Sequence, residues 1–171
     1  MRGIVCVSGS IASGKTTVSR ALAHQWPHAE SRSFGDVVRA RARLDGRPLD
    51  RPTLQDIGAQ LVAEGWSAFV AALTAGTHPD TALLVVDGIR HPAAVEALQA
   101  RFPEALTRTV YLRADEQVAA ARMLERGEPT HTRSHAVESE LRDVERHADL
   151  VISSALPVAT IVRIIDALVA G

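Results

Sequence analysis

Apolar and polar positions alternate along the chain with two different periods. The run 82–87 is continuously apolar and ends in an acid, which is typical of a parallel strand covered on both faces. The stretch 53–75 repeats apolar residues every three or four positions, as a helix does, and Thr53 is its predicted N-cap. The pattern predicts further strands at 2–8, 30–34, 107–112 and 149–153, and further helices at 15–26, 36–45, 92–101, 115–126, 136–147 and 157–170.

These elements follow one another in the order βαβααβαβααβα. Strands that alternate with helices predict a three-layer α/β protein, in which about five parallel strands carry helices on both faces. No internal repeat or linker divides the sequence, so residues 1–171 are predicted to form a single domain. Two inserts interrupt the alternation, at 35–76 and 127–137. Both are expected at the carboxyl edge of the sheet, where ligands bind in such folds.

Composition excludes several classes of protein. The chain has 171 residues, of which 46% are hydrophobic and 23% charged, as in an ordinary globular domain. A net charge of -1 argues against a nucleic-acid partner, and the apolar runs fall short of the roughly 20 residues that cross a bilayer. A single cysteine, Cys6, allows no internal disulfide, so cytoplasmic is the expected compartment. The helix at 157–170 is apolar enough for a core face or an interface, which leaves monomer and homodimer open.

Residues 9–16 match the phosphate-binding pattern G-x-x-x-x-G-K-[ST] between a predicted strand and a predicted helix. The glycines let the backbone curl so that N–H groups face a phosphate, and the helix N-terminus adds partial positive charge. We expect Lys15, the only lysine, to reach the β- and γ-phosphates of ATP and Thr16 to bind Mg²⁺. The predicted nucleotide-binding residues are Gly9, Ser10, Ala12, Ser13, Gly14, Lys15, Thr16 and Thr17.

Asp87 ends the apolar run 82–87, where a P-loop protein places the acid that orients Mg²⁺ through water. Gly88 permits a tight turn, and Arg90 is then expected to project over the site. The alternative interpretation is a solvated strand end followed by a turn, since strands often end in Asp-Gly.

Three arginines follow the second predicted strand. Arg39 and Arg43 share one helical face at i, i+4 spacing, whereas Arg41 points elsewhere. A bound phosphate would offset the repulsion between two like charges, because arginine grips phosphate in a bidentate fork. The alternative is a solvated basic face, and for Arg41 and Arg43 this is the better interpretation.

A second group of arginines surrounds the polar insert 127–137, which is predicted to be a short lid. Arg122 and Arg126 precede it, Arg133 lies within it, and Arg142 and Arg146 follow it. Such cations suit a lid that neutralises a transferring phosphoryl group, although nearby glutamates and aspartates could instead pair with them. His131 and His135 have no third metal ligand nearby and are interpreted as solvated loop histidines.

Together these residues resemble the nucleoside-monophosphate kinase-like branch of the P-loop kinases, which includes adenylate kinase and dephospho-CoA kinase. The segment 33–39 is similar to the family's T-G-D-x-x-R, which implies that Arg39 binds the acceptor phosphate. The segment 87–90 is similar to D-G-x-P-R without its proline and one residue shorter, which implies the same for Arg90. Arg122 and Arg126 match the pair that opens the lid. The resemblance implies a P-loop NTPase fold, Mg²⁺-ATP as donor and a closing lid.

The predicted function is Mg²⁺-ATP-dependent phosphoryl transfer to a small acceptor, with catalytic residues Lys15, Asp36, Arg90, Arg122 and Arg126. If the acceptor is a nucleoside or deoxynucleoside monophosphate, Arg39, Arg90 and Arg133 bind it, and Asp36 helps to organise the waters of Mg²⁺. If it is a hydroxyl, Asp36 is the candidate general base. A nucleotide-dependent switch is a third alternative, although acceptor-side arginines have no role in one.

Overall fold

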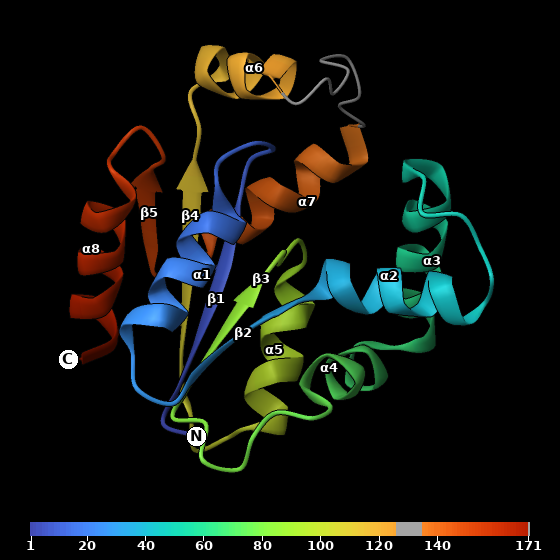
Figure 1. The fold of residues 1–171 in the computed structure, drawn as a ribbon, viewed down its shortest axis with the longest axis horizontal. Helices are drawn as coiled ribbons and strands as arrows, with labels where there is room; N and C mark the ends of the chain where they lie inside the picture. The colour runs from blue at the N-terminus through green and yellow to red at the C-terminus, as the bar shows by residue number, and fades with distance from the viewer. Residues whose placement is uncertain (126–134, 171) are drawn as a thin grey trace.

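The computed structural model describes residues 1–125 and 135–170. Its strands are β1 (Gly3–Gly9), β2 (Ala29–Ser33), β3 (Leu83–Asp87), β4 (Leu106–Arg113) and β5 (Leu150–Ser153). They form one parallel sheet in the order β2-β3-β1-β4-β5 (Figure 1). The helices are α1 (Lys15–Gln25), α2 (Phe34–Leu44), α3 (Arg51–Glu64), α4 (Trp66–Thr74), α5 (Pro92–Arg101), α6 (Glu116–Glu125), α7 (His135–Arg146) and α8 (Val158–Ala170). The predicted parallel α/β sheet is confirmed.

Alternate residues of the central strands enter two separate cores. Val5 and Val7 of β1 pack under α1 and α8, whereas Ile4 and Cys6 pack under α4, α5 and the end of α7. Because β1 is buried on both faces, its side chains are apolar throughout the strand apart from Ser8 near its end. Burial raises the pKa of the Cys6 thiol to about 12, which leaves it an unreactive core residue.

The helical stretch predicted as one element at 53–75 is two helices, so that prediction was wrong. α3 and α4 meet at Gly65, whose φ of 111° and ψ of 143° end the first helix, and their axes differ by 113°. The predicted cap was also wrong, because Asp50 caps α3 by accepting a hydrogen bond from the Thr53 N–H at 2.9 Å. No single helix among the described residues is long and apolar enough to cross a membrane, and α3 with α4 reaches that composition only as this bent pair.

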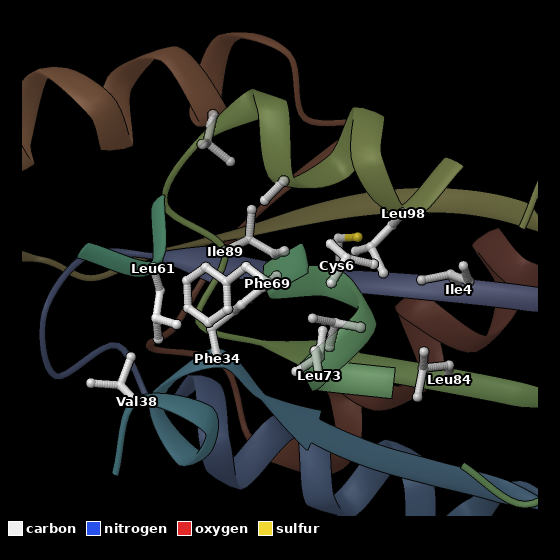
Figure 2. Packing of buried hydrophobic residues seen from close by; sticks show 14 of the residues in the cluster. Ile4, Cys6, Phe34, Val38, Leu61, Phe69, Leu73, Leu84, Ile89 and Leu98 are labelled. Carbon is white, nitrogen blue, oxygen red and sulfur yellow. The ribbon is translucent and has the colours of Figure 1, made fainter. Parts of the chain in front are cut away.

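The insert that contains α2, α3 and α4 leaves the sheet at the carboxyl end of β2. Figure 1 shows α2 and α3 beside the sheet, beyond its β2 edge. Buried apolar residues hold the insert to the core: Phe34 packs against Phe69, and Val38 and Leu61 lie next to this pair (Figure 2). The insert is therefore a packed part of the fold whose first residues stand at the carboxyl edge of the sheet.

Candidate active site

The loop between β1 and α1 is braced against the end of β4. The Ser10 N–H donates to the Leu112 carbonyl at 3.2 Å, and the Ser10 hydroxyl accepts from the Ala114 N–H at 2.9 Å. A Cβ added to Gly9 would lie 2.3 Å from the Leu112 carbonyl oxygen, a distance that backbone atoms do not tolerate. Only glycine therefore allows β1 to turn into the loop at this point.

The loop then curls into α1 without a side-chain cap. Ala12 has a φ of 58° and Gly14, the N-cap, a φ of 83°, and no side chain accepts a hydrogen bond from the first turn of α1. Thr16 and Thr17 in that turn are exposed. Uncapped N–H groups at a helix N-terminus suit an anion, because they carry the partial positive charge of the helix dipole.

Lys15 lies over the mouth of this loop. Its Nζ donates to the carbonyl oxygens of Gly9 at 3.0 Å and Ser10 at 2.8 Å, and lies 3.5 Å from the Ser13 hydroxyl. The ammonium group is thus held where the oxygens of a bound phosphate chain would meet it, and phosphate oxygens would replace the two carbonyls as its partners.

Thr16 and Asp87 meet although 71 residues separate them. The Thr16 hydroxyl donates to Asp87 Oδ2 at 2.6 Å, and Asp87 is only 5% exposed. Its second oxygen, Oδ1, is buried and has no hydrogen-bond partner among the described residues. A buried carboxylate oxygen without a partner is costly unless something occupies it. A hydroxyl beside a carboxylate is the donor set that Mg²⁺ uses next to a P-loop, so these residues fit that ion.

The turn after β3 is tied to β1 by a residue that sequence reasoning missed. The hydroxyl of Ser8, which is fully buried, donates to the Ile89 carbonyl at 2.7 Å, and the Gly88 N–H donates to the Val7 carbonyl at 3.2 Å. Arg90 follows directly and is exposed, and no hydrogen bond or ion pair joins it to another described residue. The only sequence signal for Ser8 is a polar residue at the end of an apolar strand.

The start of α2 lies beside this turn, because Ser33 and Asp87 are register partners on β2 and β3. The Ser33 hydroxyl accepts the Gly35 N–H at 3.1 Å and so caps α2. Arg39 turns back over the first turn, where it donates to Asp36 Oδ1 at 2.7 Å. The two predicted acceptor-binding residues on α2 are therefore paired with each other, with side chains 41% and 72% exposed.

The remaining arginines separate into two groups. Arg122 of α6 lies on the phosphate loop, with Nη1 3.1 Å from the Ala12 carbonyl and Nη2 3.3 Å from the Ser154 carbonyl. By contrast, surface ion pairs hold Arg41 to Asp45 and Glu64 and Arg146 to Asp143, while Arg43 and Arg142 are exposed. Arg126, His131 and Arg133 lie outside the described residues, as does the side chain of His135.

Comparison with known proteins agrees with this geometry. Three solved structures share the fold across nearly their whole length, although their sequences are distant. One is a tunicamycin resistance protein of Deinococcus radiodurans, which is 20% identical with a TM-score of 0.64 over 99% of this chain and 96% of that one. The second is the shikimate kinase of Acinetobacter baumannii in complex with shikimate, which is 18% identical with a TM-score of 0.63 over 99% of this chain and 94% of that one. The third is the shikimate kinase of Aquifex aeolicus, which is 18% identical with a TM-score of 0.59 over 95% of this chain and 93% of that one. No curated protein matches the sequence significantly.

The family model described as an AAA domain matches residues 5–145, which include the phosphate loop, the insert after β2 and the turn after β3. The resemblance to P-loop kinases that the motifs indicated is thereby confirmed at the level of family and fold. This chain belongs to the AAA domain family and has the five-stranded parallel fold of the P-loop kinases.

Proposed function

We propose that this protein is an ATP-dependent kinase that transfers the γ-phosphoryl group to a small acceptor. The observation that carries the proposal is the pair of Thr16 and Asp87 beside the phosphate loop, with one buried carboxylate oxygen lacking a partner among the described residues. A protein that merely bound an anion would have no use for that oxygen, whereas a kinase uses such an acid to hold Mg²⁺ against the β- and γ-phosphates.

On the donor side, different residues of the chain are proposed to bind the phosphates and the Mg²⁺ of ATP. The uncapped N–H groups at the start of α1 would hold the phosphate oxygens, and Lys15 would bridge the β- and γ-phosphates. Thr16 and Asp87 would hold Mg²⁺, and the bound ion would screen the negative charge that the attacking oxygen must approach. Arg122 lies against the loop and, with Arg126 just before the proposed lid 127–137, would neutralise charge on the transferring group.

A phosphate is the acceptor group that the acceptor side supports best. Arg39 lies on α2, which follows β2, and Arg90 lies in the turn after the adjacent strand β3, where its side chain has no protein partner among the described residues. An incoming phosphate would take Arg39 from Asp36, and a charge-assisted pair to a dianion is stronger than the exposed ion pair it replaces. The acceptor is then a nucleoside or deoxynucleoside monophosphate bound by the insert 35–76, with Arg133 closing over it.

A hydroxyl acceptor is the second candidate, and one observation favours it. Asp36 is 72% exposed in the first turn of α2, so it can approach an alcohol and accept its proton. The shikimate kinases that share the fold are named for such an acceptor. Asp36→Asn separates the two candidates, because it should abolish transfer to an alcohol and leave transfer to a phosphate at a substantial fraction of the original kcat.

The test is ADP release from Mg²⁺-ATP with nucleoside monophosphates, deoxynucleoside monophosphates, dephospho-CoA and shikimate as acceptors. We expect strong stimulation by one monophosphate. Lys15→Ala should reduce that rate about 100-fold or more, because the lost ammonium stabilises charge that develops in the transition state. Circular dichroism of the variant checks that it folds. Unchanged turnover in folded Lys15→Ala, or no stimulation by any acceptor, would contradict the proposal.

A further inference from the structure

A cluster of aromatic rings lies beside the acceptor side of the site. The ring of Trp66, the first residue of α4, stacks on Phe69 with centroids 5.8 Å apart and an angle of 12° between the planes. It meets the edge of Phe34 at 6.0 Å and 86°. Phe34 and Phe69 are buried, at 6% and 5% exposure, whereas Trp66 is only partly buried. Trp66 is therefore the member of the cluster that reaches the surface.

The partners of Trp66 fix its position relative to the acceptor residues. Phe34 follows the last residue of β2 and precedes the segment with Asp36 and Arg39. His91 follows Arg90, and its ring centroid lies 5.2 Å from that of Trp66 at an angle of 55°. Trp66 thus contacts both segments that follow the carboxyl ends of β2 and β3.

Covering the core does not by itself require a tryptophan at this place. The two rings that Trp66 contacts in this core, Phe34 and Phe69, are buried, whereas the larger indole is left partly in water. A flat aromatic face beside cationic groups is a platform on which a planar ring can stack, and aromatic stacking of a base contributes about 1–3 kcal/mol.

We infer that Trp66, supported by His91, is the wall against which the acceptor places a flat heteroaromatic ring, while Arg39 and Arg90 hold its anionic end. The inference rests on the proposed function and narrows it, because it selects acceptors that carry a base-like ring over sugar phosphates or alicyclic alcohols. It also assigns specificity to two residues that no motif includes.

The two tryptophans of the chain allow a direct binding test. Trp26 packs in the core on the opposite face of the sheet, where its Nε1 donates to Asp166 at 2.6 Å, so Trp26→Phe leaves Trp66 as the only indole. With Mg²⁺ and a non-hydrolysable ATP analogue saturating the donor site, AMP, CMP, GMP and dTMP are titrated against ribose 5-phosphate. We expect saturable quenching of Trp66 by at least one ring-bearing compound and none by ribose 5-phosphate. Trp66→Phe, which retains Trp26, is the matched control and should show no quenching.

The second measurement compares affinities. Trp66→Leu keeps an apolar cover over Phe69 but removes the flat face, so the Kd of the quenching monophosphate, measured by titration calorimetry, should rise about tenfold while that of ribose 5-phosphate stays unchanged. Trp66→Phe keeps a ring and should lose less, which controls for damage to folding. Absence of quenching by all four monophosphates, or equal losses of affinity for the quenching monophosphate and ribose 5-phosphate, would overturn the inference. If a monophosphate quenches Trp66 but is never phosphorylated, the inferred role of Trp66 in binding is supported and the kinase proposal is contradicted.

Discussion

At the scale of single residues, the arginines of α2 show how position decides the use of a charge. Arg39 turns back toward the start of its helix and lies within the edge of the site, with its guanidinium nitrogens 3.4 Å from the Cβ position of Gly35. Arg43 is one helical turn further along and exposed, and its side chain makes no hydrogen bond or ion pair to the other described residues. The two share a helix and a chemistry but differ in their distance from the carboxyl edge of the sheet, where we propose that the acceptor binds.

We therefore expect Arg39→Ala to raise the KM of the acceptor by roughly 10- to 100-fold, since a charge-assisted hydrogen bond contributes about 1.5–3 kcal/mol. The KM of ATP should change little. Arg43→Ala is the matched control and should leave both constants unchanged. Initial rates measured against each substrate in turn provide the comparison. Equal rises in the two constants, or equal effects of the two substitutions, would remove Arg39 from the acceptor side.

Local spacing is what made part of this site predictable from the sequence. The phosphate-loop pattern fixes Lys15 and Thr16 within one turn, and the end of a buried strand fixes Asp87, so their meeting at the sheet edge follows from parallel topology. Trp66 and Ser8 were not predicted as site residues, because their roles depend on partners from different elements. No pattern within one element predicts that Trp66 contacts residues that follow two different strands.

At the scale of elements, the strands were predicted well and the insert less well. Helical periodicity continues through Gly65, since apolar residues recur at helical spacing on both sides of it. The structure nevertheless bends there by 113°, because α4 packs on β2 and α5 while α3 packs on α2. A single glycine in a helical pattern is compatible with a continuous helix, so only tertiary packing decides between the two outcomes.

Tertiary contacts also fix the loop before β3, because the carboxylate of Glu30 on β2 holds this loop. Glu30 Oε1 accepts from the His78 N–H at 2.7 Å and the Thr81 hydroxyl at 2.6 Å, and Oε2 accepts from Arg32 at 2.7 Å. Partial burial raises the pKa of Glu30, but the hydrogen bonds from Thr81, His78 and Arg32 outweigh it and leave the pKa below its usual 4.5.

The sign of this shift predicts a pH dependence. Because the pKa of Glu30 is lower in the folded state, its contribution to stability is complete above pH 4.5 and is lost as the pH falls through the folded value. Glu30→Gln should lower the free energy of unfolding by about 1 kcal/mol at pH 7. Urea denaturation at several pH values should show this difference shrinking below pH 4.5. A difference that is constant down to pH 3 would contradict the account.

At the scale of the whole molecule, the sheet converts distant segments into one site. The sequence predicted parallel strands covered on both faces, but it did not predict their order, because periodicity reports burial and not neighbours. The order β2-β3-β1-β4-β5 places β1 at the centre, so the phosphate loop is braced by β4 on one side and faces Asp87 of β3 on the other. A ligand bound there contacts segments from most of the fold.

Mg²⁺-ATP should therefore stabilise the entire chain. At about 100 times its Kd, a ligand that binds only the folded state adds roughly 2.7 kcal/mol, which for a domain of this size raises Tm by about 5–11 °C. Thermal unfolding followed by circular dichroism checks this. The shift should disappear in Lys15→Ala and should fall when EDTA removes Mg²⁺. A full shift in the presence of EDTA would show that Thr16 and Asp87 do not hold the ion.

The position of Lys15 gives the protein a single side chain that reports on its phosphate loop. Apart from the amino terminus, its amine is the only primary amine in the chain, and it lies in the phosphate loop. A lysine-specific endoprotease therefore has one bond to cut, the one between Lys15 and Thr16, and an amine-reactive dye has one side chain to label. Because a ligand in the loop would shield Lys15, resistance to either reagent shows that the loop is occupied. A gel reads this result without any knowledge of the substrate.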